Sequence, residues 1–215
     1  MFDSHSHYYS KEALVCGSDL ELPSALSLGN GIGLLPPYVN SQTLAEIERL
    51  IVENPTFFIG EVGLDRRFES QCPLNEQIEQ LRRILDLARE LNRPAVLHCV
   101  RYDGHMISIL KDYSDLSLMW HGFCGSVEIG RILMKQGVLV SFRPGFGTAG
   151  HILAREFPNR ILVESDYTGN DGDAYLMTLK ENYREVAFAT GMNVGELEEN
   201  CRGLGEIFTH KQIHR

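Results

Sequence analysis

The sequence predicts an α/β fold, a TIM-type (β/α) barrel, on three observations. Short apolar runs alternate with amphipathic helical patterns, as expected for parallel strands joined by crossover helices. The chain supplies roughly seven or eight such runs, a number that favours a barrel over an open doubly wound sheet. Its 215 residues suit one domain, residues 1–215, and contain no linker-like stretch and no internal repeat.

The predicted strands are short. The first is Met1–His7, and further strands are expected within Pro23–Leu35. The remaining strand candidates are Phe57–Val62, Ala95–His98, Leu116–His121, Val138–Phe142 and Ile161–Glu164. The Gly-rich stretch Gly29–Gly33 lacks the G-x-G-x-x-G pattern, so it indicates no dinucleotide site.

Helices are expected where apolar residues recur at three- and four-residue steps. In Thr43–Glu53 the residues Leu44, Ile47 and Ile51 fall on one face, and Ser41 is the expected N-cap. The other predicted helices are Asn75–Leu91, His105–Tyr113, Ser126–Gln136, Gly172–Thr190 and Val194–Phe208.

Ligand-type side chains close five of the apolar runs. In a (β/α) barrel the active site lies at the carboxyl ends of the strands, so these side chains are expected to converge. The closing residues are His5 and His7, Glu61, His98, His121, and Glu164–Asp166. Each residue alone has a non-functional explanation, such as a surface His pair or a core histidine. Convergence at the mouth of one barrel explains all of them together. Imidazoles and carboxylates suit one or two divalent cations, and a pair about 3.5–4 Å apart can act on a phosphodiester.

Five motifs carry a resemblance to a known family. DSHSH, IGEVGLD, LHCVR, HGFCGS and VESD, in that order, resemble the TatD-like family of metal-dependent hydrolases over nearly the whole chain. That family has a TIM-barrel fold and belongs with the wider amidohydrolase group. It includes divalent-metal-dependent deoxyribonucleases, among them 3′→5′ exonucleases.

The resemblance implies two divalent metal ions (Mg, Mn or Zn) and a specific ligand set. The implied ligands are His5, His7, Glu61, His98, His121 and Asp166. By this analogy His5, His7 and Asp166 hold one ion, His98 and His121 hold the other, and Glu61 bridges the two. Asp166 would also act on the attacking water as a general base, so Asp166 and Glu61 are the expected catalytic residues.

The chain departs from the family pattern in three places. About one βα unit is shortened or missing near residues 20–38, which makes an irregular barrel the expectation. Short family members often carry a G-I-H-P type segment there, whereas Gly31–Val39 reads GIGLLPPYV without the histidine. After Asp166 the usual S-P-Y run is replaced by Tyr167–Asn170. The second and third departures concern substrate handling and specificity, and the ligand set stays whole.

Four arginines are expected near the same rim, Arg66, Arg67, Arg101 and Arg143, and Arg66, Arg101 and Arg143 are the expected substrate contacts. The planar guanidinium matches phosphate oxygens. Surface salt bridges with the many acidic residues are an equal alternative for each of them. Arg101 is favoured because it lies only three residues beyond His98.

The amino-acid composition limits the kinds of binding partner and the cellular location that we expect. The formal net charge of −9 argues against a dedicated duplex-DNA binder, so weak, metal-dependent binding of single-stranded or frayed DNA ends is expected. Five scattered cysteines without a C-x-x-C pair indicate reduced thiols and a cytoplasmic location. No apolar run is long enough for a membrane span, and the first residues do not match a signal peptide. Nothing in the sequence indicates an oligomeric state.

The predicted function is therefore a divalent-metal-dependent phosphodiesterase, a deoxyribonuclease acting on DNA ends through metal-activated water. The alternative is an ester or amide hydrolase, because the same ions polarise carbonyl groups. Many binuclear amidohydrolases bridge their ions with a carboxylated lysine, whereas here Glu61 stands at the equivalent strand end. A third possibility is a non-catalytic metal- or partner-binding module, favoured by the missing histidine and opposed by the intact ligand set.

Overall fold

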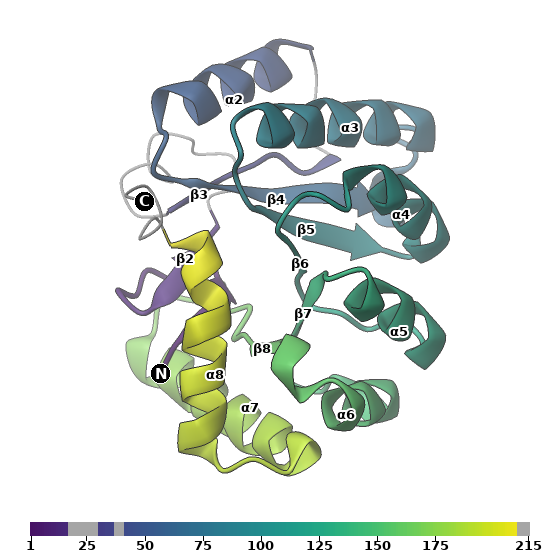
Figure 1. Ribbon diagram of the computed structural model, residues 1–215. Helices are drawn as coiled ribbons and strands as arrows, with labels where there is room; N and C mark the ends of the chain where they lie inside the picture. Colours follow the sequence, from purple (N-terminus) through teal and green to yellow (C-terminus); the bar gives the residue numbers. More distant parts are fainter. Residues whose placement is uncertain (17–29, 37–40, 210–215) are drawn as a thin grey trace. The chain divides into compact units, whose positions relative to one another are not determined.

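The computed structural model describes residues 1–16, 30–36 and 41–209 (Figure 1). The chain divides into two compact units. Unit 1 comprises Met1–Val15 and Met119–Arg215, and unit 2 comprises Cys16–Leu118. Within each unit parallel strands alternate with helices along the chain, as the sequence pattern predicts.

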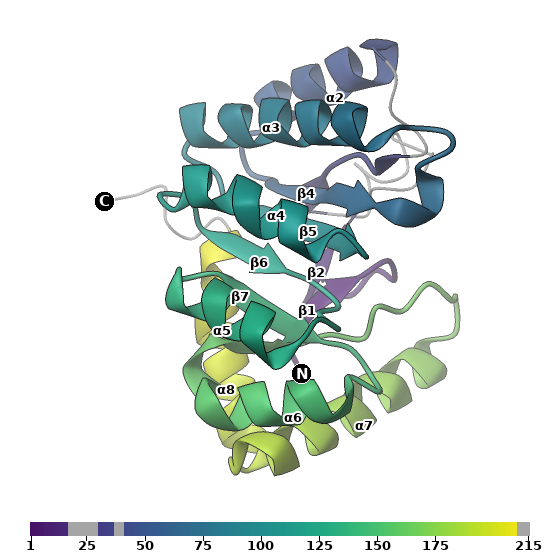
Figure 2. The same ribbon diagram turned by 90° about the vertical axis from the view of Figure 1, so that its right-hand side faces the viewer.

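Unit 2 holds three parallel strands that lie side by side in chain order. The strands are β3 (Gly31–Ile32), β4 (Phe58–Asp65) and β5 (Ala95–Val100). Each is followed by a helix: α2 (Ser41–Glu53), α3 (Leu74–Glu90) and α4 (Asp103–Leu110). Two short 3₁₀ turns also occur: Arg66–Phe68 lies between β4 and α3, and Lys111–Tyr113 follows α4. In Figures 1 and 2, α2 lies beside α3, and α3 packs along β4.

Unit 1 is built from both ends of the chain. Its strands are β1 (Asp3–Ser6), β2 (Ala13–Val15), β6 (Leu118–Trp120, whose first residue belongs to unit 2), β7 (Leu139–Phe142) and β8 (Ile161–Val163). Its helices are α5 (Val127–Lys135), α6 (Gly147–Glu156), α7 (Gly172–Thr190) and α8 (Val194–Gly205). Strands β6, β7 and β8 pair in parallel. Strand β1 lies beside β8, since the Ser4 hydroxyl donates to the Val163 carbonyl at 2.9 Å.

Local sequence signals explain several of these elements. Leu44, Ile47 and Ile51 of α2 are all buried, which confirms the predicted apolar face. Helix α5 begins after Ser126, whose hydroxyl accepts a hydrogen bond from the backbone of Ile129. Helix α8 begins with a capping box in which Asn193 and Glu196 each bond to the other's backbone N–H.

Four features differ from the expectations. Helix α2 begins at Ser41, two residues before the predicted start at Thr43, and β4 runs on to Asp65, three residues past the predicted end. Strand β2 and helix α6 were not expected. Helix α6 carries Gly150, and glycine is a poor helix former; a Cβ there would lie 2.3 Å from the Phe146 ring, so packing requires glycine.

Strands β1 and β2 form an irregular pair, which lies outside the region where an irregularity was expected. These parallel strands are joined by residues 7–12, which contain no helix and are too few for an ordinary crossover. Their register also shifts between the two paired positions. The shortened βα unit expected near residues 20–38 falls mostly at 17–29 and 37–40, outside the described residues.

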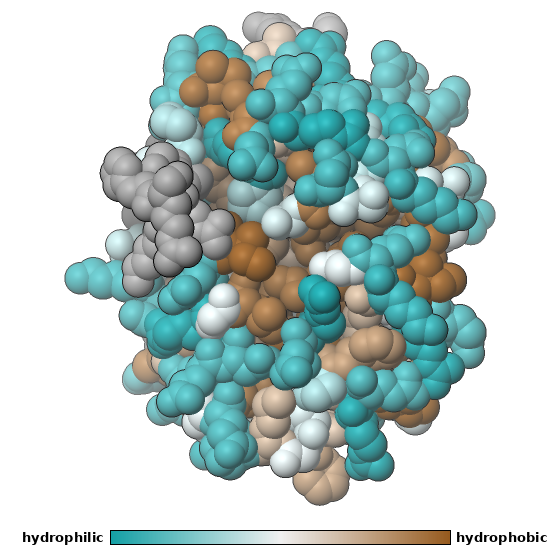
Figure 3. All heavy atoms as spheres, viewed as in Figure 1, coloured by the Kyte–Doolittle hydropathy of each residue, from teal (hydrophilic) through white to brown (hydrophobic). Residues whose placement is uncertain are grey.

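The outer faces of α2 and α3 are mainly hydrophilic in the view of Figure 3. Arg83 on α3 bonds to Glu48 on α2 there, and Arg49 pairs with Glu46 and Glu53 along α2. Across the described residues, no helix combines the length and the hydropathy that a membrane crossing needs.

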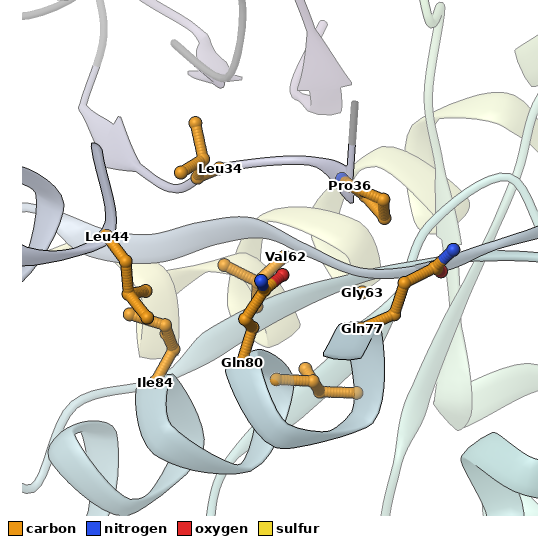
Figure 4. A pocket seen from close by; sticks show the side chains of 9 residues that line it. Leu34, Pro36, Leu44, Val62, Gly63, Gln77, Gln80 and Ile84 are labelled. Atoms are coloured by element: carbon orange, nitrogen blue, oxygen red, sulfur yellow. The ribbon is translucent and has the colours of Figure 1, made fainter. Parts of the chain in front are cut away.

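A small cavity lies inside unit 2 between α2, α3 and β4 (Figure 4). Leu44, Val62, Gly63 and Ile84 are among its lining residues. Its volume of about 10 Å³ is room for about one water molecule. The cavity is therefore a packing gap and is too small for an organic substrate.

Gly63 is a point of close contact between β4 and β5, and Gly63→Ala is expected to destabilise the protein by at least about 3 kcal/mol. A Cβ at Gly63 would lie 1.7 Å from the backbone carbonyl oxygen of His98, so the two strands would have to separate. Urea denaturation measures the effect. The matched control is Gly104→Ala in α4, where a Cβ meets nothing within 4 Å and helix propensity predicts a gain of up to about 1 kcal/mol. A loss below about 1 kcal/mol for Gly63→Ala would contradict this account of the strand contact.

Candidate metal centre

Strand β1 and the residue that follows it carry two histidines of unit 1. His5 is fully buried within β1, and His7, just past its end, is partly exposed. Their rings meet edge to face with centroids 5.1 Å apart. The carboxylate of Asp3 fixes this strand end by accepting hydrogen bonds from the backbones of His5 (3.3 Å) and Ser165 (2.9 Å).

The residues that follow β6 and β8 complete a cluster in unit 1. The His121 ring stacks on the His5 ring with a centroid separation of 3.9 Å. Asp166 Oδ1 lies 3.7 Å from His5 Nε2 and 3.9 Å from His7 Nε2. One ligand atom from each of His5, His121 and Asp166 lies within 4.8 Å of the other two, so these three residues could hold a metal ion.

The spacing and chemistry of this cluster fit a divalent cation. The separations of 3.7 and 3.9 Å are too long for hydrogen bonds. Two ligands bound at about 2.0–2.2 Å to a tetrahedral ion stand roughly 3.3–3.6 Å apart, close to these separations. Imidazole nitrogen with carboxylate oxygen is also the donor combination that Zn and Mn accept.

The two oxygens of Asp166 face different partners. Oδ1 lies on the histidine side, whereas Oδ2 is 3.4 Å from Nη1 of Arg143. The backbone N–H of Asp166 donates to the carbonyl of His5 at 3.1 Å, and φ of Asp166 is 49°, in the left-handed region. Asp and Asn adopt this conformation more readily than most residues. Asp166 can therefore face a cation with one oxygen and a polar ligand with the other.

Glu164 lies beside His121 in unit 1. Its Oε1 is 3.6 Å from His121 Nδ1, and Oε2 accepts a hydrogen bond from the Ser141 hydroxyl. Glu164 is fully buried, which opposes ionisation, but the His121 and His5 imidazoles and Ser141 outweigh burial and lower its pKa. A buried carboxylate beside the second nitrogen of a ligand histidine orients the ring and raises its basicity.

In unit 2, Glu61 and His98 lie on adjacent strands and are in direct contact. His98 Nδ1 is 2.9 Å from Glu61 Oε2. On its other side, His98 Nε2 is 3.0 Å from Asp65 Oδ2. The imidazole is thus held between two nearly buried carboxylates, one at each ring nitrogen.

Asp65 is an ionised anchor for His98. Burial, the largest single influence, would raise the pKa of Asp65, but hydrogen bonds from His98 and Arg67 outweigh it and hold the pKa well below its usual range. Gln77 on α3 fixes the backbone of Asp65 from both sides, with bonds of 2.8 and 3.1 Å. Asp65 therefore positions His98 from a rigid base.

The sequence motifs give Asp65 no role, and they place Glu164 among the ligand-type strand ends without a function of its own. Both were visible in the motifs, as the last residue of IGEVGLD and the second of VESD. A carboxylate that ends a buried apolar run needs a partner, and this was the available signal. What the sequence could not supply was the partner, since His98 is 33 residues from Asp65 and His121 is 43 from Glu164.

The expected substrate arginines differ in their surroundings. Arg143, half exposed, stands beside Asp166. Arg66 lies 3.8 Å from Glu69 on the protein surface, and it is Arg67 that bonds to Asp65. Arg101 is exposed and has a left-handed φ of 61°. Of the six expected ligands, unit 1 brings together His5, His7, His121 and Asp166, and unit 2 brings together Glu61 and His98.

Parallel strands that end in histidines and carboxylates define a metal-dependent hydrolase of the (β/α)-barrel class. The sequence model of the family described as TatD related DNase matches residues 20–203. The chain therefore belongs to the TatD family of metal-dependent hydrolases, which confirms the resemblance seen in its motifs.

The chain is also similar to individual proteins that are named as a metal-dependent hydrolase or a nuclease. The chain is 31% identical over 130 residues to the uncharacterized metal-dependent hydrolase MJ1582 of Methanocaldococcus jannaschii, a match that covers 59% of this chain and 50% of that protein. It is 35% identical over 116 residues to the 3'-5' RNA nuclease TATDN2 of Homo sapiens, covering 50% of this chain and 15% of that protein. The chain thus spans about half the length of MJ1582.

A solved structure confirms the fold class. YjjV, a TatD homolog from Escherichia coli, superposes with a TM-score of 0.76 at 17% identity, covering 92% of this chain and 85% of that chain. The TIM-type α/β barrel predicted from the sequence is therefore the fold of this protein.

Proposed function

We propose that this protein is a phosphodiesterase that acts as a deoxyribonuclease on single-stranded or frayed DNA ends, using two divalent ions (Mg, Mn or Zn). The observation that carries the proposal is the cluster of His5, His121 and Asp166, whose ligand atoms lie within 4.8 Å of one another. The family's description as TatD related DNase supports the choice of DNA.

The roles follow from the donor atoms. His5, His7, His121 and Asp166 would hold a cation in unit 1, and Glu61 and His98 offer ligands in unit 2. When bound, divalent ions supply Lewis-acid charge that stabilises a developing phosphorane and favours ionisation of water. Asp166 Oδ2, which lies 3.4 Å from Arg143 Nη1, would accept the proton of the attacking water. Arg143 gains little from its exposed pair with Asp166, so it is available to bind a phosphate oxygen.

The test is the shortening of 5′-labelled single-stranded DNA by the purified protein with Mn²⁺ or Mg²⁺. The protein should shorten the DNA, EDTA should stop the reaction, and the double variant His98→Ala/Asp166→Ala, purified identically, should be inactive. Equal activity of that variant would reveal a contaminating nuclease, and no shortening with either metal would contradict the proposal.

A second candidate substrate is RNA, because the relative TATDN2 is named as a 3'-5' RNA nuclease. An RNA strand of the same sequence in the same assay separates the two candidates. Phosphodiester, ester and amide chromogenic probes test the wider alternative of an ester or amide hydrolase, which the same metal chemistry allows. We also propose that the enzyme is cytoplasmic, because its five cysteines are scattered along the sequence without a C-x-x-C pair, a pattern typical of reduced thiols.

A further inference from the structure

An open depression in unit 1 lies beside the candidate metal residues. It has a volume of about 520 Å³, within the usual range of about 300–1,000 Å³ for small-molecule sites. Its lining includes Tyr8, Tyr9, Tyr175, Leu176, Asp171 and Asp173, and it is called the tyrosine depression below. The proposed mechanism uses none of these side chains.

Tyrosine rings pack against one another beside the depression, and the ring of Tyr9 is exposed. The Tyr8 ring lies 4.8 Å from the buried Tyr175 ring at an interplanar angle of 31°, and both rings meet Tyr167 at 5.9 Å. Tyr9, by contrast, is 52% exposed, and Leu176 is 45% exposed. An exposed aromatic ring and an exposed aliphatic side chain on one depression indicate a surface for a flat ligand.

The tyrosine depression shares its chain segments with the metal cluster. Tyr8 and Tyr9 directly follow His7, and Tyr167 directly follows Asp166. The backbone N–H of His7 donates to the carbonyl of Tyr167 at 3.1 Å, which ties the two segments together. A ligand whose phosphate lies at the histidines therefore has its neighbouring group within reach of the depression.

The charge of the depression selects which part of a nucleotide it can hold. Its charged lining consists of Asp171 and Asp173, with no lysine or arginine among the described residues that line it. Both carboxylates are exposed at the start of α7. They repel phosphate, but they accept hydrogen bonds from amino groups. The preferred group is thus flat, uncharged and equipped with an amino donor.

We propose that the tyrosine depression binds the base of the terminal nucleotide by stacking on Tyr9, and prefers bases with an exocyclic amino group. This inference rests on the proposed function, because it assumes a nucleic-acid substrate. Aromatic stacking is worth enough to matter at an open site, since removal of one stacking ring weakens binding of single strands by roughly ten-fold or more.

The test measures nucleotide binding by NMR titration of the full chain, in EDTA so that no turnover occurs. The probes are dCMP and dUMP, which differ in the amino and oxo groups of the base. Tyr9→Ala should weaken dCMP binding about ten-fold, and Tyr9→Trp should retain it. The matched control is Phe188→Ala, which removes an 81% exposed aromatic ring elsewhere on α7 and should leave binding unchanged. The protein should bind dCMP more tightly than dUMP, and Asp173→Asn should reduce that difference.

Two results would overturn the inference: no measurable dCMP binding by the unmodified protein, or equal dCMP affinity of the Tyr9→Ala variant. Equal affinity for dCMP and dUMP would overturn the amino-group preference. DNA hydrolysis with Mn²⁺ is measured separately. Binding through Tyr9 without cleavage contradicts the proposed function alone, whereas cleavage with unchanged binding by Tyr9→Ala contradicts this inference alone.

Discussion

Asp166→Asn is expected to lower metal-dependent hydrolysis by at least about 10³-fold. The carboxylate provides Oδ1 to the histidine cluster and Oδ2 to the face beside Arg143, so the amide removes both a negative ligand and the proposed base. A general base alone contributes about 10²–10⁴-fold. Mn²⁺ affinity, measured by calorimetry, should fall at least about ten-fold, and kcat/KM on single-stranded DNA measures the loss of activity.

The asparagine variant separates chemistry from folding. The φ of 49° at Asp166 suits asparagine as well as aspartate, so unfolding in EDTA should change by less than about 0.5 kcal/mol. Asp112→Asn is the matched control, because that carboxylate is 58% exposed and pairs with Arg82 at the surface. Metal-dependent activity of Asp166→Asn within ten-fold of the unmodified protein would remove Asp166 from both proposed roles.

The elements predicted best are those whose ends carry local signals. Helix α7 runs over Gly172–Thr190, as the sequence predicts, because Asp171 caps its first N–H groups and Gly191 ends it at a φ of 77°. Strand β2 escaped prediction because it has only three residues, too few to show a period. Helix α6 was not predicted because its glycines lower the local helix propensity, although Gly150 is required beside the ring of Phe146, the residue that precedes the helix.

The site was predictable as a set of residue types but not as a set of contacts. Histidines at strand ends can be recognised from the sequence, because active sites of the (β/α)-barrel class lie at the carboxyl ends of strands. The carboxylates beside those histidines cannot be predicted from the sequence in the same way. Asp65 reads as the end of a motif and Glu164 as a strand residue, and only the fold places each beside an imidazole nitrogen. Sequence periodicity contains no information on such pairing across strands.

The buried carboxylate of Asp3 makes the free energy of unfolding depend on pH. Its carboxylate is completely buried, and burial raises its pKa to about 7, although hydrogen bonds from Ser165 and His5 oppose the rise. Folding therefore favours the protonated acid. The stabilisation is complete below the unfolded-state pKa near 3.8 and is lost as the pH rises to about 7. Because one pKa unit corresponds to about 1.4 kcal/mol, the loss is about 4 kcal/mol across this window.

Asp3→Asn is accordingly expected to remove most of that pH dependence. Asparagine keeps an oxygen for the backbone N–H groups of His5 and Ser165, and its amide can donate to the Ser165 hydroxyl. The variant should match the unmodified protein near pH 4 and exceed its free energy of unfolding by about 4 kcal/mol at pH 8. Urea denaturation in EDTA at several pH values measures both curves, with Asp112→Asn as the exposed control. Parallel curves for Asp3→Asn and the unmodified protein between pH 4 and 8 would show that Asp3 does not titrate in this range.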